Sequence, residues 1–200
     1  KSRLKNIKIR QKLLKVNAPR QIVLILDFGS QYTQLIARRV RENKVFSQII
    51  PYNTPAKEIA EMAPKGLILS GGPASVIQKK SPYPDKGIFK LNLPILGICY
   101  GMQAIAEMLG GKVKHTKGRE FGKTELFIDD NHDIFYHLPG NLTCWASHGD
   151  YVSKLPPGFR VSARTLNAPI AAISNRSKKI YGVQFHPEVT HTDKGTQMLA

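Results

Sequence analysis

The stretch Pro94–Leu109, PILGICYGMQAIAEML, decides the fold that we expect for this 200-residue chain. Its first five residues form a short apolar run, which predicts a strand covered on both faces of a sheet. From Gly101 to Leu109 apolar side chains recur at helical spacing, and Gly110-Gly111 would end that helix. A buried strand that leads directly into a helix is typical of α/β proteins with a parallel sheet.

The same alternation of strand and helix continues on both sides of this stretch. Upstream, we expect strands at Gln21–Asp27, Phe46–Tyr52 and Gly66–Ser70, and helices at Ser30–Glu42 and from Thr54-Pro55 to about Ala63. Downstream, we expect strands at Thr124–Ile128, Leu142–Ser147, Phe159–Thr165, Ile170–Ser174 and Ile180–Phe185, and a last helix at Lys194–Ala200. The pattern predicts an α/β fold with an open, mostly parallel, flavodoxin-like sheet, helices on both faces and an antiparallel extension.

Half of the net charge of +16 lies in the first tenth of the chain. Residues 1–20 hold eight of the 30 basic side chains and none of the 14 acidic ones, so the other 180 residues carry a net charge of +8. We expect residues 1–20 to form a disordered or frayed basic extension, followed by one domain at 21–200. A basic arm can instead bind nucleic acid or an acidic partner, and that alternative stays open.

The overall composition excludes several classes of protein. The chain is 42% hydrophobic and 22% charged, which is ordinary for a globular protein and unlike a disordered, collagen-like or coiled-coil chain. Its longest aliphatic run, Ile22–Leu26, is far shorter than the roughly 20 residues of a membrane helix. Two cysteines, Cys99 and Cys144, are too few for a secreted disulfide framework, which favours the cytoplasm. We expect Cys144, which lies in an apolar run, to belong to the core.

Cys99 is the candidate nucleophile. It stands in Gly97-Ile98-Cys99-Tyr100-Gly101, between the expected strand and the expected helix. Glycines on both sides of a strand-to-helix turn allow one residue to occupy a strained, exposed tip. The N-terminal end of the following helix would favour the thiolate. The alternative is a free cysteine that packs as a small hydrophobic side chain.

His186 is the candidate base for this thiol. It follows an apolar strand in Gln184-Phe185-His186-Pro187-Glu188, and the carboxyl ends of strands are where α/β sheets place catalytic groups. Residues two apart in an extended segment share a side, so Glu188 can orient the imidazole. The sequence therefore predicts a Cys–His–Glu arrangement. The alternative is a surface loop that carries these residues by chance.

Acyl transfer by this arrangement would also need donors for an oxyanion. The backbone amide of Tyr100, directly after the nucleophile, is the first candidate. Gly72 is the second, because Ser70-Gly71-Gly72-Pro73 follows another expected strand and paired glycines can turn an amide into a cleft.

These motifs together resemble the class I, triad-type glutamine amidotransferases, and further segments are similar to the amidotransferase domains of the GMP synthase family. The resemblance covers about residues 21–198. The segments that resemble the whole class are Ser70–Pro73 (SGGP), Gly97–Gln103 (GICYGMQ) and Gln184–Val189 (QFHPEV). Those that are similar to the GMP synthase family are Asp27–Glu42 (DFGSQYTQLIARRVRE), Arg119–Gly122 (REFG), Ser147–Asp150 (SHGD) and Val189–Thr192 (VTHT).

The resemblance implies a role for each matching residue. Cys99 would attack the carboxamide of L-glutamine to form a γ-glutamyl thioester, His186 would carry the proton, and Glu188 would orient His186. The amides of Gly72 and Tyr100 would hold the oxyanion. The residues implied in glutamine binding are Gln103, Ser147, Gly149 and Asp150.

The resemblance also implies a partner. In this family an ATP-pyrophosphatase (synthetase) domain uses ATP and Mg²⁺ to adenylate XMP, and ammonia then displaces AMP to give GMP. The sequence lacks the Ser-Gly-Gly-Val-Asp-Ser type of loop of that domain, so we expect this chain to be a separate subunit or a fragment, without cofactor or metal of its own. Two alternatives remain: an amidotransferase for CTP or anthranilate synthesis, and a non-catalytic module with an RNA-binding arm.

Overall fold

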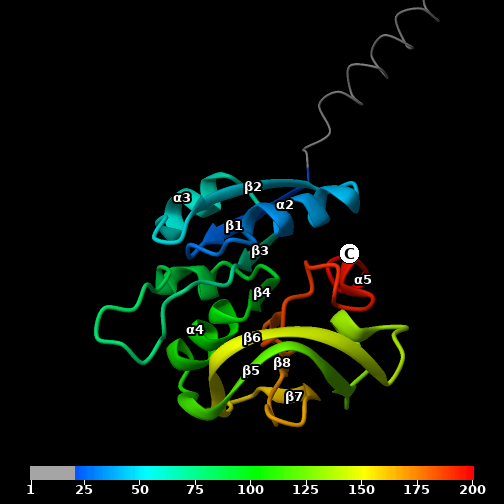
Figure 1. The fold of residues 1–200 in the computed structure, drawn as a ribbon. Coiled ribbons are helices and arrows are strands. Elements are labelled where there is room, and N and C mark those ends of the chain that lie inside the picture. Colours follow the sequence, from blue (N-terminus) through cyan, green and yellow to red (C-terminus); the bar gives the residue numbers. More distant parts are fainter. Residues whose placement is uncertain (1–20) are drawn as a thin grey trace, which may run out of the picture.

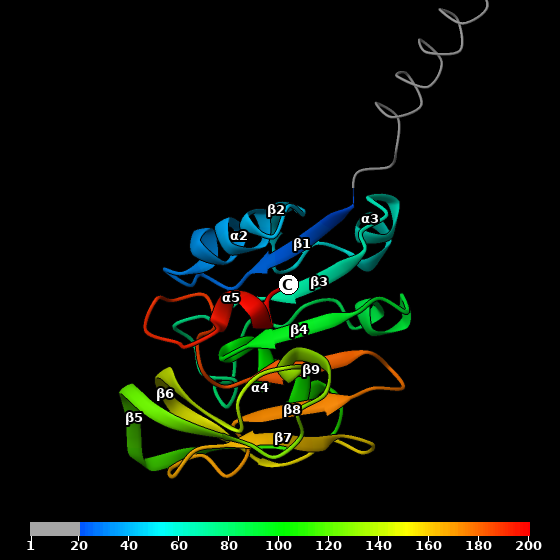
Figure 2. The same ribbon diagram turned by 90° about the vertical axis from the view of Figure 1, so that its right-hand side faces the viewer.

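The computed structural model describes residues 21–200, except for the side chains of residues 116–119 within one long strand. The basic extension expected at 1–20 lies outside the described residues. Within them, nine strands form one sheet in the order β2-β1-β3-β4-β9-β8-β7-β5-β6 (Figure 1). Figure 2 shows this sheet running from β2 at one end of the molecule to the pair β5 and β6 at the other. No helix of the described part is long and apolar enough to cross a membrane.

Five neighbouring strands form the parallel half of the sheet, and their apolar runs explain why they are buried. They are β1 (Ile22–Asp27), β2 (Phe46–Pro51), β3 (Gly66–Leu69), β4 (Ile95–Ile98) and β9 (Ile180–Val183). Leu24, Ile25 and Leu26 of β1 are fully buried, as expected for a strand covered on both faces. The order β2-β1-β3-β4-β9 is the doubly wound order of flavodoxin-like sheets.

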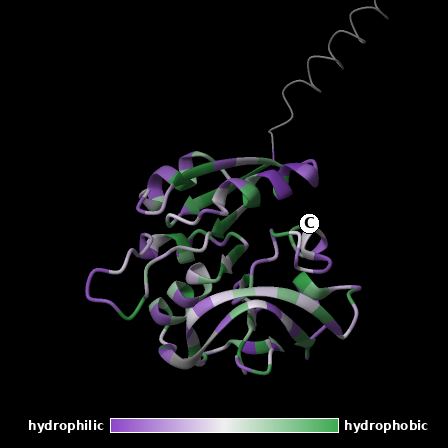
Figure 3. Ribbon diagram, viewed as in Figure 1, coloured by the Kyte–Doolittle hydropathy of each residue, from purple (hydrophilic) through white to green (hydrophobic). Residues whose placement is uncertain are grey.

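The other four strands form the antiparallel half. They are β5 (Lys112–Ile128), β6 (Asn141–Lys154), β7 (Arg160–Arg164) and β8 (Ala172–Asn175). The α/β class with an antiparallel extension is therefore confirmed, although that extension contributes as many pairings as the parallel half. The lengths expected for β5 and β6 were wrong, because both strands run far beyond Thr124–Ile128 and Leu142–Ser147. Figure 3 shows the reason, since hydrophilic and hydrophobic residues alternate along these strands and form no apolar run.

Helices cover both faces of the sheet, as expected. They are α2 (Thr33–Glu42), α3 (Ala56–Glu61), α4 (Tyr100–Met108) and α5 (Gly195–Met198), with short 3₁₀ turns η1 (Lys86–Lys90) and η2 (Asp133–Phe135). Leu24 and Leu26 of β1 belong to a core shared with α3 and α4. Ile25, on the opposite side of the strand, belongs to a second core with α2, α5 and Cys144, which is fully buried as predicted.

Helix α2 begins later than the sequence pattern indicates, at Thr33 rather than at Ser30. Side chains of the preceding loop hold the backbone in turns instead of a helix. Asp27 Oδ1 accepts from the Gly29 amide at 2.9 Å and from the Thr33 hydroxyl at 2.7 Å. The Ser30 hydroxyl accepts from the Tyr32 amide at 3.1 Å. Such local bonds compete with helix formation, and here they direct the loop along the carboxyl edge of the sheet.

Candidate active site

The turn from β4 into α4 presents Cys99. Its backbone has φ 50° and ψ −105°, a strained conformation for a residue with a side chain. A Cβ atom on Gly97 would lie 2.6 Å from the Gly101 carbonyl group, and one on Gly101 would overlap the Leu69 carbonyl oxygen. Both flanking glycines are therefore needed for the close packing of this turn. Cys99 as a whole residue is only 7% exposed, so it lies inside a pocket rather than at an exposed tip.

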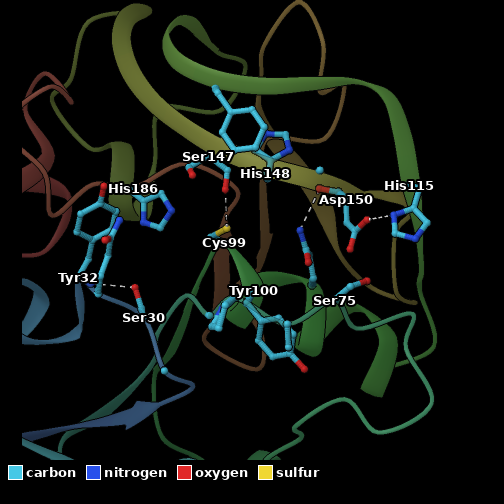
Figure 4. A pocket seen from close by; sticks show the side chains of 18 residues that line it. Ser30, Tyr32, Ser75, Cys99, Tyr100, His115, Ser147, His148, Asp150 and His186 are labelled. Atoms are coloured by element: carbon cyan, nitrogen blue, oxygen red, sulfur yellow. Dashed lines mark hydrogen bonds and ion pairs between the residues drawn. The ribbon is translucent and has the colours of Figure 1, made fainter.

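A pocket of about 710 Å³ opens beside the thiol. Eight of the nine predicted site residues line it, although they come from four separate parts of the chain. These residues are Gly72, Cys99, Tyr100, Gln103, Ser147, Gly149, Asp150 and His186. Glu188 is fully buried and lies behind His186 (Figure 4 shows the pocket). The structure thus brings the predicted residues together.

His186 is held by bonds on both its backbone and its ring. Its amide donates to the Trp145 carbonyl at 2.9 Å, and its carbonyl accepts from the Thr192 hydroxyl at 2.6 Å. Nδ1 of the ring lies 2.7 Å from Glu188 Oε1. The ring of Tyr32 contacts the imidazole in an edge-on arrangement, with centroids 5.1 Å apart. The imidazole therefore has one fixed orientation and presents its other nitrogen away from Glu188.

Cys99 and His186 both lie next to Gly71 in the folded chain. A Cβ atom on Gly71 would lie 3.2 Å from His186 Cε1 and 3.7 Å from Cys99 Cβ. Burial alone would lower the pKa of His186, but the hydrogen bonds and charges of Cys99 and Glu188 outweigh it and raise that pKa to about 10. These neighbours therefore favour the charged form of the imidazole, whose Nδ1 faces Glu188.

The two predicted oxyanion donors are close to Cys99. Tyr100 is the first residue of α4, where a backbone N–H has no acceptor within the helix. Its side chain points away from the thiol, with the hydroxyl donating to the Pro82 carbonyl at 2.6 Å (Figure 4). Gly72 packs so tightly that a Cβ atom would lie 2.6 Å from the Phe28 carbonyl oxygen. This close approach requires glycine there and leaves the backbone of Gly72 on the pocket wall.

The residues predicted to bind glutamine are partly bonded to one another. Gln103 Nε2 lies 3.0 Å from the Asp150 carbonyl and 3.3 Å from Gln184 Oε1. The carboxylate of Asp150 contacts Nδ1 of His115 at the edge of the pocket. The Ser147 carbonyl lies 3.8 Å from Cys99 Sγ.

Several residues that line the pocket had no predicted role, and three groups of them stand out. The loop Gly29–Tyr32, His115 and Phe121 all line the cavity. The loop belongs to the quoted segment that begins at Asp27, and its position directly after a parallel strand was an available signal, because carboxyl ends of parallel strands meet at one edge. His115 and Phe121 belong to the unpredicted part of β5, and we find no signal in the sequence that would have identified them.

Two buried side chains, Glu120 and His148, form a pair at the pocket, and His148 is one of the lining residues. His148 Nε2 lies 3.1 Å from Glu120 Oε2, and both side chains are about 95% buried. Burial alone would raise the pKa of Glu120, but bonds from His148, Thr124 and Thr165 lower it. His148 and Glu120 face each other across β5 and β6, so only the strand register brings them together.

The chain was compared with known proteins. The family model "Glutamine amidotransferase class-I" matches residues 24–200. GMP synthase [glutamine-hydrolyzing] of Thermosynechococcus vestitus is 53% identical over 180 residues, which is 90% of this chain and 34% of that protein. The Carboxydothermus hydrogenoformans protein of the same name is 54% identical over 177 residues, 88% of this chain and 35% of the relative. The chain therefore spans about a third of the length of these relatives.

The comparison with solved structures gives the same family. A Thermoplasma acidophilum protein described as a GMP synthase subunit has a TM-score of 0.82 and 33% identity, with 90% of each chain covered. A Thermotoga maritima glutamine amidotransferase has a TM-score of 0.68 over 85% of this chain and 77% of that one, and at 24% identity it shows the fold alone. The chain therefore belongs to the class-I glutamine amidotransferase family, within the branch formed by the amidotransferase domains of GMP synthases.

Proposed function

We propose that this chain hydrolyses L-glutamine and supplies the ammonia for GMP synthesis. The observation that carries the proposal is the position of His186, which lines the same pocket as Cys99 while its Nδ1 is 2.7 Å from the buried Glu188. This is the arrangement needed to activate a thiol for attack on a carboxamide. The raised pKa of His186 favours the charged imidazole, which can stabilise negative charge on a neighbouring sulfur.

The first half of the reaction releases ammonia. The Cys99 thiolate attacks the side-chain carbonyl carbon of glutamine, a C–S bond forms, and the electron pair of the C=O π bond moves onto oxygen. The backbone amides of Gly72 and Tyr100 donate to this oxyanion. His186 then gives a proton to the amide nitrogen, the C–N bond breaks, and ammonia leaves a γ-glutamyl thioester. Glu188 stabilises the charged imidazole before this transfer.

The second half regenerates the thiolate. Water attacks the thioester carbon while neutral His186 takes one of its protons, and the same two amides hold the second oxyanion. The C–S bond then breaks, the sulfur leaves as thiolate beside the imidazolium, and the acid product ionises to glutamate. Each step uses a group that already lies in the pocket.

The pocket has groups that suit both ends of glutamine. The Asp150 carboxylate can pair with the α-ammonium group, in exchange for its contact with His115. Oε1 of Gln103 can accept from the carboxamide, and Ser147 and Gly149 line the same pocket. Glutamine in this position would place its carboxamide over Cys99.

The ammonia would be used by a synthetase domain or subunit that adenylates XMP with ATP and Mg²⁺. The names of the relatives and the two thirds of their length that this chain does not cover support that partner. A direct test is to mix the chain with a GMP synthetase domain, XMP, ATP and Mg²⁺ and to measure glutamine-dependent formation of GMP. GMP formation with ammonia but not with glutamine would contradict the proposal.

The nucleophile is tested with two cysteine variants. We expect Cys99→Ala to abolish glutamine hydrolysis while the fold is kept. Cys144→Ser is the matched control, because burial raises the pKa of that thiol to about 12 and keeps it out of the pocket. Glutamate release by Cys99→Ala at the rate of the unaltered chain would exclude Cys99 as the nucleophile.

A further inference from the structure

The side chain of Gln184 contacts the sulfur of Cys99. The Nε2 atom of Gln184 lies 3.8 Å from Sγ, and Gln184 is only 1% exposed. We propose that Gln184 is a catalytic residue that donates an N–H hydrogen bond to the Cys99 thiolate. The inference rests on the proposed function, because it concerns the nucleophile of that reaction.

The orientation of the Gln184 carboxamide follows from its other partner. Gln103 donates through Nε2 to Gln184 Oε1 at 3.3 Å, and the same nitrogen donates to the Asp150 carbonyl at 3.0 Å. If the Gln184 amide were reversed, two N–H groups would face each other and an oxygen would face the sulfur. The bonding network therefore directs the N–H side of Gln184 toward Cys99.

The sulfur lies between a donor and an acceptor. The Ser147 carbonyl, 3.8 Å from Sγ, can accept a bond from the neutral thiol but repels a thiolate. Gln184 can donate to the thiolate, and hydrogen bonds to a charged acceptor are stronger than those between neutral groups. Because Gln184 and Gln103 are almost fully buried, water cannot replace this donor. Of these two contacts, the one from Gln184 is the one that favours the reactive form.

Gln184 differs from the charged groups near Cys99 because it is neutral and does not change its protonation state. His186 faces the sulfur with Glu188 behind it, the N-terminal end of α4 begins at Tyr100, and His148 and Asp150 line the same pocket from β6. His186 must give up its proton when ammonia leaves, so its charge changes during the cycle. Gln184 keeps its N–H groups throughout and can stabilise the thiolate both before attack and when the thioester is cleaved.

Alkylation of Cys99 by iodoacetamide tests the proposal without the glutaminase reaction. In this reaction the thiolate sulfur bonds to the CH₂ carbon and iodide leaves, so the pH at which the rate is half-maximal reports thiolate formation. Gln184→Met keeps the side-chain length but removes the donor, and we expect its midpoint to move upward by about one pH unit. Gln184→Glu, which places a carboxylate beside the sulfur, should show a larger upward shift.

Two further variants separate this role from a structural one. Asn175→Leu removes another buried carboxamide, at the far end of β8 from the pocket, and should leave the alkylation midpoint unchanged. Gln103→Met removes the donor that orients Gln184 and should give a smaller upward shift, even if a Gln184 variant fails to fold by circular dichroism.

Unchanged alkylation midpoints in folded Gln184→Met and Gln103→Met would overturn the proposal. Lower thermal stability without a shifted midpoint would do the same, because it would reveal a purely structural role. Neither result would contradict the proposed function, which is tested separately by glutamine hydrolysis in Cys99→Ala and by glutamine-dependent GMP formation.

Discussion

Two parts of the sheet form the pocket in different ways. The parallel strands β1, β3, β4 and β9 end in backbone turns that form one side of it. The antiparallel strands β5 and β6 contribute side chains and carbonyl groups to the other side. The turns work through close packing, and they carry Cys99, Gly72 and His186. The pair of strands β5 and β6 is instead held by a buried polar network that includes Glu120 and His148. The geometry of Cys99 and the structure of its surroundings thus depend on different kinds of interaction, which can be disturbed separately.

The largest effect on the free energy of unfolding should appear when two glycines are compared. Gly101 lies at the turn after the parallel strand β4, and Gly122 lies in the antiparallel strand β5. Gly101→Ala would press a Cβ atom into the Leu69 carbonyl group, so we expect the free energy of unfolding to fall by about 4 kcal/mol or more. Gly122→Ala, on β5, meets no atom within 4 Å and suffers only from its φ of +102°, so a loss of about 1 kcal/mol is expected. Urea titration of both variants measures the difference. Equal losses would show that close packing does not distinguish the parallel half.

Removing the buried polar network of the antiparallel half should give the second largest loss of stability. Glu120→Leu leaves the buried His148 and two threonine hydroxyls without their acceptor, and we expect a loss of about 3 kcal/mol. Glu125→Leu, on the exposed side of the same strand, is the control and should change stability far less. A small effect at Glu120 would mean that the network does not stabilise the hairpin.

The stability of the folded chain should depend on pH through His186, which lies where the two halves of the sheet meet. Its pKa of about 10 in the folded chain lies above its ordinary value of 6.5, so its stabilising contribution is complete below pH 6.5 and is lost as pH rises toward 10. Unfolding free energies measured across this range should therefore fall more for the unaltered chain than for Cys99→Ala, which lacks the sulfur partner. Parallel curves for the two proteins would exclude the thiolate as a cause of the raised pKa.

The smallest effect is expected at the solvent-exposed end of the antiparallel half. Arg176 joins the β8–β9 turn to Asp130 at 2.7 Å and to Asp133 at 2.7 Å. Exposed ion pairs contribute little because water and salt screen them. Arg176→Ala should therefore shift the thermal midpoint only slightly, and added salt should remove the shift. A large loss that persists at high salt would show that this turn stabilises the whole sheet.

The sequence predicted the parallel half better than the antiparallel half. The bounds of β1, β3 and β4 differ from the expected ones by a single residue, because these strands are short apolar runs ended by polar or glycine residues. For β5 and β6 the expected strands covered only part of the observed ones. Their buried positions include Glu120, His148 and Asp150, which a hydrophobic pattern cannot reveal. Only pairing with the neighbouring strand satisfies these groups.

The candidate site divides in the same way. Cys99, His186 and Glu188 were predictable because each lies in a short motif at the end of a strand, and strand ends meet at one edge of a parallel sheet. Tyr32 and Gln184 lie within motifs but received no predicted role. Their importance lies in contacts with His186 and Cys99 that no local spacing encodes.

By itself the sequence determined the strained cysteine turn, the glycines around it and the alternation of buried strands and helices, because these depend on interactions within a few residues. The tertiary structure alone decided that Gln184 reaches a sulfur 85 positions earlier, that Glu120 pairs with His148, and that Tyr32 borders His186. Those contacts follow from the register of strands and from the order in which they lie in the sheet. Register and order are properties of the whole packed core, so no single segment carries them.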